Sequence, residues 1–184
     1  MRPPAPPYAN ERPHALWHVS EEDGIELFVP HVSATAATAE PLVWAIDSRH
    51  LPLYWFPREC PRTTFWADAG TTARDARLLH GAPRVHAVEG AWLERMRAAH
   101  VVAYRLPDAS FRPYPEAGGY FVSNETVEPL ELVELGDLLQ LHVAAQIELR
   151  IVPNLWPLWN TVTASTLEYS GMRLRNAAPA EPSG

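Results

Sequence analysis

The stretch LPLYWFPRECPR, residues 51–62, constrains the fold more than any other part of the sequence. Proline fixes its own φ angle, lacks an amide donor and disfavours a helical residue before it. Pro57 therefore ends any helix in this stretch, and Arg58 cannot join a helix interior because Pro57 and Pro61 flank it. The aromatic run at residues 54–56 predicts either core packing or a wall for a flat ring, next to a rigid arginine.

Hydrophobic periodicity along the rest of the chain indicates many short elements rather than a helical bundle. Three leucines and a histidine at i, i+3, i+4 and i+7 share one helical face and predict a helix over about residues 134–146: Leu135, Leu138, Leu139 and His142. Strand-like apolar runs lie at residues 15–20, 42–46, 62–67 and 147–152. We therefore expect an α+β fold with a mixed or antiparallel sheet flanked by short helices.

A chain of 184 residues is long enough to bury one hydrophobic core. The proline-rich segments at the two ends predict flexible tails over residues 1–13 and 177–184, with a single globular domain over 14–176. The first segment lacks the apolar region of a signal peptide, and no window approaches about 18 consecutive apolar residues. We therefore expect a cytoplasmic protein with no membrane contact.

The charged residues of the chain exclude several kinds of catalytic and binding site. All 15 basic residues are arginine, which excludes a Schiff-base lysine and a P-loop lysine. The formal net charge of −7 argues against a groove that follows a phosphate backbone, although it leaves nucleic acid open as a partner.

The eight histidines and the single cysteine form no metal-binding pattern, so we predict no metal site. His142 falls on an apolar helix face, as expected of a core histidine. His18 differs, because alternation along LWHVS places Leu16, His18 and Ser20 on one face of a strand. That face would offer two hydrogen-bonding side chains. The ordinary alternative is a histidine that caps a backbone group.

Arg58 is the second candidate for a functional residue. A guanidinium on a backbone fixed by Pro57 can bind a diphosphate through two parallel hydrogen bonds. The alternative is a surface ion pair between Arg58 and Glu59 or Glu40, with the neighbouring aromatic residues in the core.

Three segments, LWHVS, LPLYWFPR and AQIELRIVP, follow one another in an order that resembles the ADP-ribosyltransferase fold, most closely the DarT-type toxins that modify DNA. The resemblance covers about thirty residues. It implies a split sheet and NAD as a substrate. It also implies that His18, Ser20, Tyr54 and Arg58 bind NAD, and that Glu148 is catalytic together with Arg58 and His18.

The implied roles fit the chemistry of the residues. Cleavage of the nicotinamide–ribose bond develops an oxocarbenium-like charge, which the Glu148 carboxylate could stabilise while holding the ribose 2′-hydroxyl. His18 and Ser20 would hold the adenosine ribose or the nicotinamide amide. Arg58 would fix the diphosphate, and Tyr54 would stack near the nicotinamide ring.

Several alternatives stay open at this point. Glu125 in SNETVEP or Glu168 in STLEYSG could replace Glu148 as the key carboxylate. The chain could also be a non-catalytic module that binds a ligand or a partner on the same fold. A third option is an unrelated enzyme that uses His18 and a glutamate as acid and base.

Nearly the whole chain, over residues 15–176, also resembles an uncharacterised bacterial family with HFSEE-, VWAID-, FPRDCPR- and PNLWPLW-like segments. That second resemblance implies no activity.

Overall fold

The computed structural model describes residues 15–32 and 38–180, which fold into two compact units. Unit 1 comprises the described residues up to Trp55 together with His100–Gly136. Unit 2 comprises Phe56–Ala99 and the described residues from Asp137 onward. The chain thus passes from unit 1 to unit 2 within the aromatic run. The expected single domain over residues 14–176 stays a prediction, and the expected tail over 1–13 lies outside the described residues.

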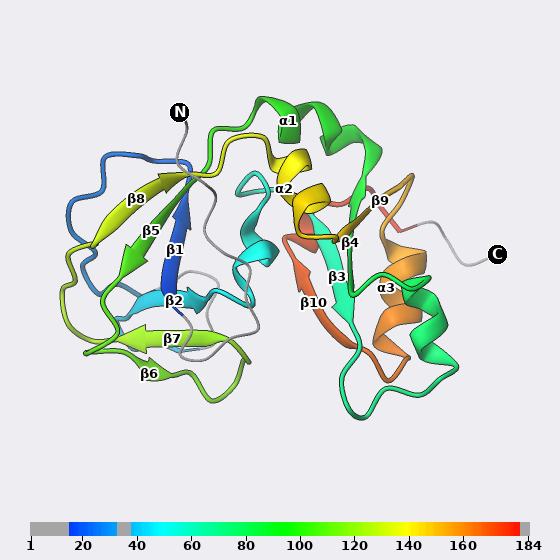
Figure 1. The fold of residues 1–184 in the computed structure, drawn as a ribbon, viewed down its shortest axis with the longest axis horizontal. Coiled ribbons are helices and arrows are strands. Elements are labelled where there is room, and N and C mark those ends of the chain that lie inside the picture. Colours follow the sequence, from blue (N-terminus) through cyan, green and yellow to red (C-terminus); the bar gives the residue numbers. More distant parts are fainter. Residues whose placement is uncertain (1–14, 33–37, 181–184) are drawn as a thin grey trace. The chain divides into compact units, whose positions relative to one another are not determined.

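Unit 1 is a six-stranded antiparallel sheet with the order β6-β7-β2-β1-β5-β8 (Figure 1). A short 3₁₀ helix, η1 (Leu51–Tyr54), follows β2. The strands are β1 (Leu16–Ser20), β2 (Val43–Asp47), β5 (Val102–Leu106), β6 (Arg112–Pro113), β7 (Tyr120–Ser123) and β8 (Glu131–Glu134).

The core of unit 1 lies on the sheet face that carries Leu16, His18 and Ser20. These residues pair with Leu106, Tyr104 and Val102 on β5, so their side chains share one face. The buried cluster on this face contains Leu16, Phe28, Val43, Ala45, Val102, Tyr104, Leu106 and Val127. The predicted alternation along β1 is therefore confirmed.

Unit 2 is built on a four-stranded mixed sheet with the order β10-β3-β4-β9. Only the β4–β9 pair is parallel. The strands are β3 (Arg62–Trp66), β4 (Arg84–Glu89), β9 (Glu148–Val152) and β10 (Glu168–Met172). The helices are η2 (Asp75–Leu79), η3 (Gly90–Trp92), α1 (Leu93–Ala98), α2 (Leu138–Ala144), α3 (Trp156–Thr163) and η4 (Leu174–Asn176). The chain is thus α+β, as expected.

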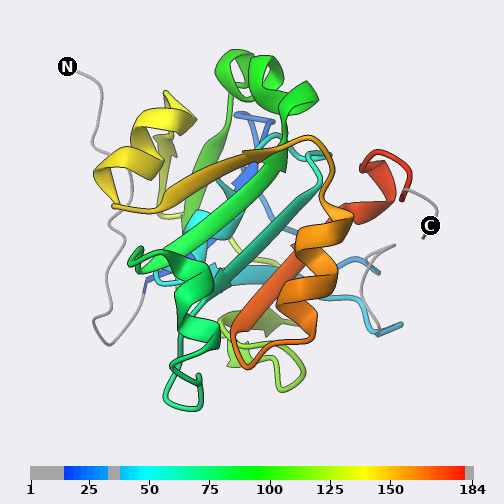
Figure 2. The ribbon, with the colours of Figure 1, turned by 90° about the vertical axis from the view of Figure 1, so that its right-hand side faces the viewer.

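Both faces of the unit 2 sheet are covered. One face carries α3 (orange in Figure 2) and η2. There Val162 of α3 and Leu79 of η2 pack with Phe65 and Val85. On the other face, Val88 and Leu149 pack among side chains from α1, α2 and the turn before β3. A Cβ on Gly171 would come within 2.5 Å of the Trp159 ring, so glycine is required where α3 crosses β10.

The helix expected over 134–146 is shorter, because it begins only at Leu138. Residues 131–134 form β8, and Gly136 takes a positive φ of 70° that separates strand from helix. The Asp137 carboxylate then accepts hydrogen bonds from the amides of Leu139 and Gln140 and begins α2. Within the described residues, no helix is long and apolar enough to cross a membrane.

A buried histidine pair joins α2 to the sheet of unit 2. The His142 Nδ1 donates to the Leu138 carbonyl oxygen at 2.7 Å, because a carbonyl can only accept. In neutral His142 the Nε2 is then the acceptor, and His86 Nδ1 donates to it at 3.0 Å. The predicted core position of His142 is confirmed, since only 1% of this residue is exposed.

The surroundings of the pair keep both rings neutral. Burial lowers the pKa of His142 to about 4. Burial, reinforced by His142, Arg84 and Arg62, lowers the pKa of His86 well below its usual value. Because both values are lower than the 6.5 of an unfolded histidine, the unfolded state binds more protons below pH 6.5.

The first prediction follows from this pair. The free energy of unfolding of unit 2 is expected to be constant above about pH 6.5 and to fall toward pH 4, by about 1.4 kcal/mol per pH unit for each histidine. Urea denaturation at pH 7.5, 6 and 5 measures it. His142→Gln should flatten the dependence, whereas the exposed His31→Gln should not. Equal slopes in both variants would contradict the assignment.

Candidate functional site

The sequence-predicted site residues fall in both units: His18, Ser20 and Tyr54 in unit 1, and Arg58 and Glu148 in unit 2. Convergence of all five on one ligand therefore stays a prediction.

His18 and Ser20 have local structural roles on β1. The His18 Nδ1 donates to the Trp44 carbonyl oxygen on β2 at 3.0 Å, and its ring lies 4.8 Å from the Phe28 ring. The Ser20 hydroxyl accepts a hydrogen bond from the Glu22 amide. The backbone-capping alternative for His18 is thus present in the structure. The same bond fixes the ring orientation, which a ligand-binding histidine also needs.

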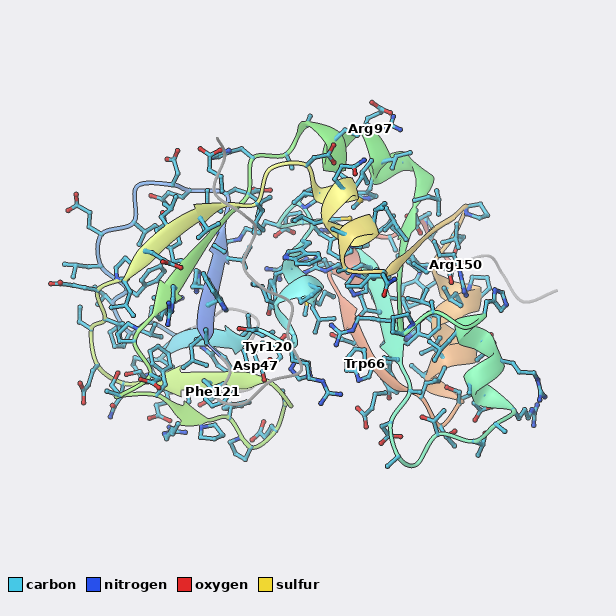
Figure 3. The ribbon with its side chains drawn as sticks, viewed as in Figure 1. Asp47, Trp66, Arg97, Tyr120, Phe121 and Arg150 are labelled. Carbon is cyan, nitrogen blue, oxygen red and sulfur yellow. The ribbon has the colours of Figure 1, made fainter. Side chains whose placement is uncertain are left out.

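Tyr54 ends η1 with its hydroxyl 2.8 Å from the hydroxyl of Tyr120 on β7. Tyr120 is labelled in Figure 3. The two rings meet edge to face, with centroids 6.4 Å apart. The neighbouring Trp55 and Phe56 are buried, so most of the aromatic run is core, as the ordinary alternative holds. Tyr54 is only partly buried.

Arg58 is exposed on a tight turn, which the Cys60 amide closes by donating to the Pro57 carbonyl oxygen at 2.9 Å. The C-terminal segment holds this turn from outside. Arg173 Nε donates to the Arg58 carbonyl oxygen at 3.2 Å. The side-chain amide of Asn176 donates to the backbone carbonyl oxygen of Glu59 at 2.8 Å. These contacts are consistent with the rigid backbone expected at Arg58, and the predicted role of its side chain stays a prediction.

The two carboxylates proposed as ordinary partners of Arg58 contact other arginines. Glu59 lies 3.4 Å from Arg173 and 3.1 Å from Arg175, while Glu40 contacts Arg112 at 3.4 Å. A hydrogen bond from Asn176 lowers the pKa of Glu59, and the charges of Arg173 and Arg175 lower it further against partial desolvation. Glu59 is thus held as a carboxylate by the C-terminal segment.

The buried Glu89 at the end of β4 anchors that same segment. Its carboxylate accepts hydrogen bonds from the Ala178 amide and from the Leu155 amide at the start of α3. The Ala178 carbonyl in turn accepts from the Trp156 ring at 2.8 Å. These bonds tie the beginning of the expected 177–184 tail to unit 2, while residues 181–184 lie outside the described residues.

Glu148 opens β9, and its side chain is 32% exposed. Its Oε1 accepts a hydrogen bond from Arg150 Nε at 2.8 Å. Arg150 also donates to the Leu78 carbonyl oxygen and lies over the Phe65 ring. Glu148 and Arg150 therefore share the α3 face of the sheet, with Leu149 opposite as predicted.

Sheet register separates Glu148 from the Arg58 turn. At the Arg62 end of β3, the paired residues are Val88 on β4 and Ile151 on β9. Glu148 lies three residues, about 10 Å, along β9 from that level and two strand spacings, again about 10 Å, across the sheet. One ligand would have to be extended to reach both residues.

The other candidate groups are more peripheral. Glu125 and Glu168 are exposed. Among the described residues, no three His, Cys, Asp or Glu side chains gather closely enough to hold a metal ion. Unit 2 also has an open groove of about 520 Å³ between η2 and the end of α3, lined by Thr72, Arg74, Asp75, Leu78, Thr161, Ala164 and Ser165.

Sequence reasoning missed Arg173, Arg175, Asn176 and Glu89. The only local signal is a pair of arginines two residues apart in GMRLRN. Their contact with Glu59 spans more than 110 residues, so no local pattern reports it.

The second prediction concerns the Glu89 anchor. Glu89→Gln replaces an acceptor oxygen with a donor that faces backbone amides, so the free energy of unfolding should fall by about 2 kcal/mol. Denaturant titration and trypsin cleavage near Arg173 and Arg175 measure the loss. The exposed Glu94→Gln serves as the control and should stay within about 0.5 kcal/mol of the parent. Unchanged stability in Glu89→Gln would refute the anchor.

Comparison with known proteins places the chain in a family and goes no further. No curated protein and no solved structure matches it. A family model described as "Family of unknown function (DUF6886)" matches residues 17–177. This range includes every named strand of both units except the first residue of β1. The chain therefore belongs to the DUF6886 family of unknown function.

Proposed function

We propose that this chain binds NAD, with Arg58 on the diphosphate, and that it transfers or hydrolyses the ADP-ribosyl group. The Arg58 turn carries this proposal. Its backbone is held by the Cys60 amide, which donates to the Pro57 carbonyl oxygen, and by Arg173, which donates to the Arg58 carbonyl oxygen. A guanidinium on a fixed backbone has fewer conformations to lose when it binds a diphosphate through two bonds. The two separate sheets fit the split sheet that the ADP-ribosyltransferase resemblance implies.

In the proposed reaction, the bond between the ribose C1′ and the nicotinamide nitrogen breaks, and its electron pair leaves with nicotinamide. A new bond forms between C1′ and the oxygen of water or a nucleophile of an acceptor, whose proton passes to solvent. Glu148 would stabilise the positive charge that develops on the ribose. Arg150 fixes one oxygen of this carboxylate at 2.8 Å, which orients the other.

The second candidate is a non-catalytic module that binds the same ligand. The Glu148–Arg150 ion pair favours it, because a carboxylate already paired with an arginine stabilises a developing cation less. The distance along the sheet between Glu148 and the Arg58 turn favours it as well. A cytoplasmic location, where NAD is abundant, suits either candidate and stays a prediction.

The third prediction tests the proposed function by calorimetric titration of NAD into the full chain. Saturable binding is expected. Arg58→Ala should weaken it about tenfold or more, because a charge-assisted pair of bonds is lost. Arg58→Lys should weaken NAD binding less than Arg58→Ala does, since lysine keeps the charge but lacks the planar fork of donors. Arg97→Ala removes another exposed arginine of unit 2 and should bind like the parent.

Nicotinamide release measures catalysis separately from NAD binding. Glu148→Gln should bind NAD like the parent but release less nicotinamide, as measured by chromatography. Binding without nicotinamide release by the parent chain would favour the non-catalytic module. No binding at millimolar NAD, or equal loss in Arg58→Ala and Arg97→Ala, would overturn the proposed function.

A further inference from the structure

We infer that Arg173 and Arg175 form an anion-binding site beside the Arg58 turn, with Glu59 as its internal competing anion. The site would take a diphosphate or a terminal phosphate. The inference rests on the proposed function only for the identity of the natural ligand, the diphosphate of NAD. The contacts of the two arginines within unit 2 carry the inference itself.

Most hydrogen-bond donors of Arg173 and Arg175 have no acceptor among the described residues. Each guanidinium carries five N–H donors in a planar fork. Within the described residues, Arg173 uses its Nε, toward the Arg58 carbonyl and Glu59, and Arg175 uses one Nη2 bond to Glu59. The other donors of both forks contact no acceptor in the described part of the chain. A phosphate group accepts several such bonds at once.

The charge around the turn also favours an anion. Arg58, Arg173 and Arg175 contribute three positive charges, and Glu59 contributes one negative charge, so these four residues carry a net +2 in a chain of net charge −7. The Arg175 side chain is 59% exposed and can reach solvent. A local excess of positive charge raises the concentration of anions near it.

The backbone conformation at Arg173 brings both Arg173 and Arg175 into contact with the Glu59 carboxylate. Arg173 has a φ of 54°, a left-handed conformation that is uncommon for any residue except glycine. It begins η4, which brings Arg175 and Asn176 back onto Glu59. The Glu89–Ala178 bonds then hold the far end of the segment. A strained residue between two fixed ends indicates that this geometry is specified.

Glu59 contacts the same guanidinium groups that an external anion would use. Its carboxylate is half exposed, and it is therefore not held by burial. An external phosphate would compete with it for Arg175. The inference thus assigns opposite effects to two neighbouring side chains: removal of the Arg175 charge weakens anion binding, and removal of the Glu59 charge strengthens it.

The fourth prediction uses inorganic pyrophosphate as the probe, titrated calorimetrically into the full chain at low salt. Arg175→Ala should weaken binding about tenfold. Glu59→Gln should tighten it several-fold, because glutamine keeps the shape and the Asn176 contact but loses the charge. Arg97→Ala should bind like the parent, since it removes an exposed arginine from α1 in the same unit. Circular dichroism checks that each variant is folded.

The outcomes separate this inference from the proposed function. Pyrophosphate binding that depends on Arg175 but is not accompanied by NAD binding would keep the anion site and overturn NAD as its ligand. NAD binding that depends on Arg58 but not on Arg175 would overturn the inference and keep the proposed function. Equal losses in Arg175→Ala and Arg97→Ala, or weaker binding in Glu59→Gln, would also overturn the inference.

Discussion

The burial of β4 is the constraint on which the rest of unit 2 depends. All six residues of this strand are buried, and three of them, Arg84, His86 and Glu89, carry polar groups that must find partners there. His86 donates to His142 and so holds α2, while Glu89 holds the start of α3 and the C-terminal segment. Deep burial makes each of these bonds costly to lose.

The candidate site follows from that framework. Because Glu89 fixes Ala178, the segment before it can place Arg173 and Asn176 against the Arg58 turn. The turn is then rigid for two independent reasons, its prolines and its C-terminal contacts. Rigidity favours binding, since a pre-organised arginine loses less freedom when a ligand arrives. Glu148 lies on β9 of the same sheet, three residues along the strand from the level of the Arg62 end of β3. Binding at the Arg58 turn and catalysis by Glu148 can therefore be tested with separate variants.

Local patterns in the sequence predict the local elements and miss the distant pairings. Alternation predicts that His18 and Ser20 share one face of β1, and the pairing with β5 confirms it. The helix that apolar spacing predicts over 134–146 is too long, because this spacing does not reveal the positive φ of Gly136. The division of the chain within the aromatic run and the Glu59–Arg175 pair depend on contacts across the sequence, which spacing does not encode.

Hydrogen–deuterium exchange with and without NAD tests the central claim most directly, because it locates a ligand on the fold. We expect slower exchange of the backbone amides in residues 58–60 and 173–178 when NAD is added, since a ligand on the arginines would stabilise the turn and the C-terminal segment that contacts it. Unchanged exchange in these two segments, together with slower exchange around the groove at residues 72–78 and 161–165, would contradict it.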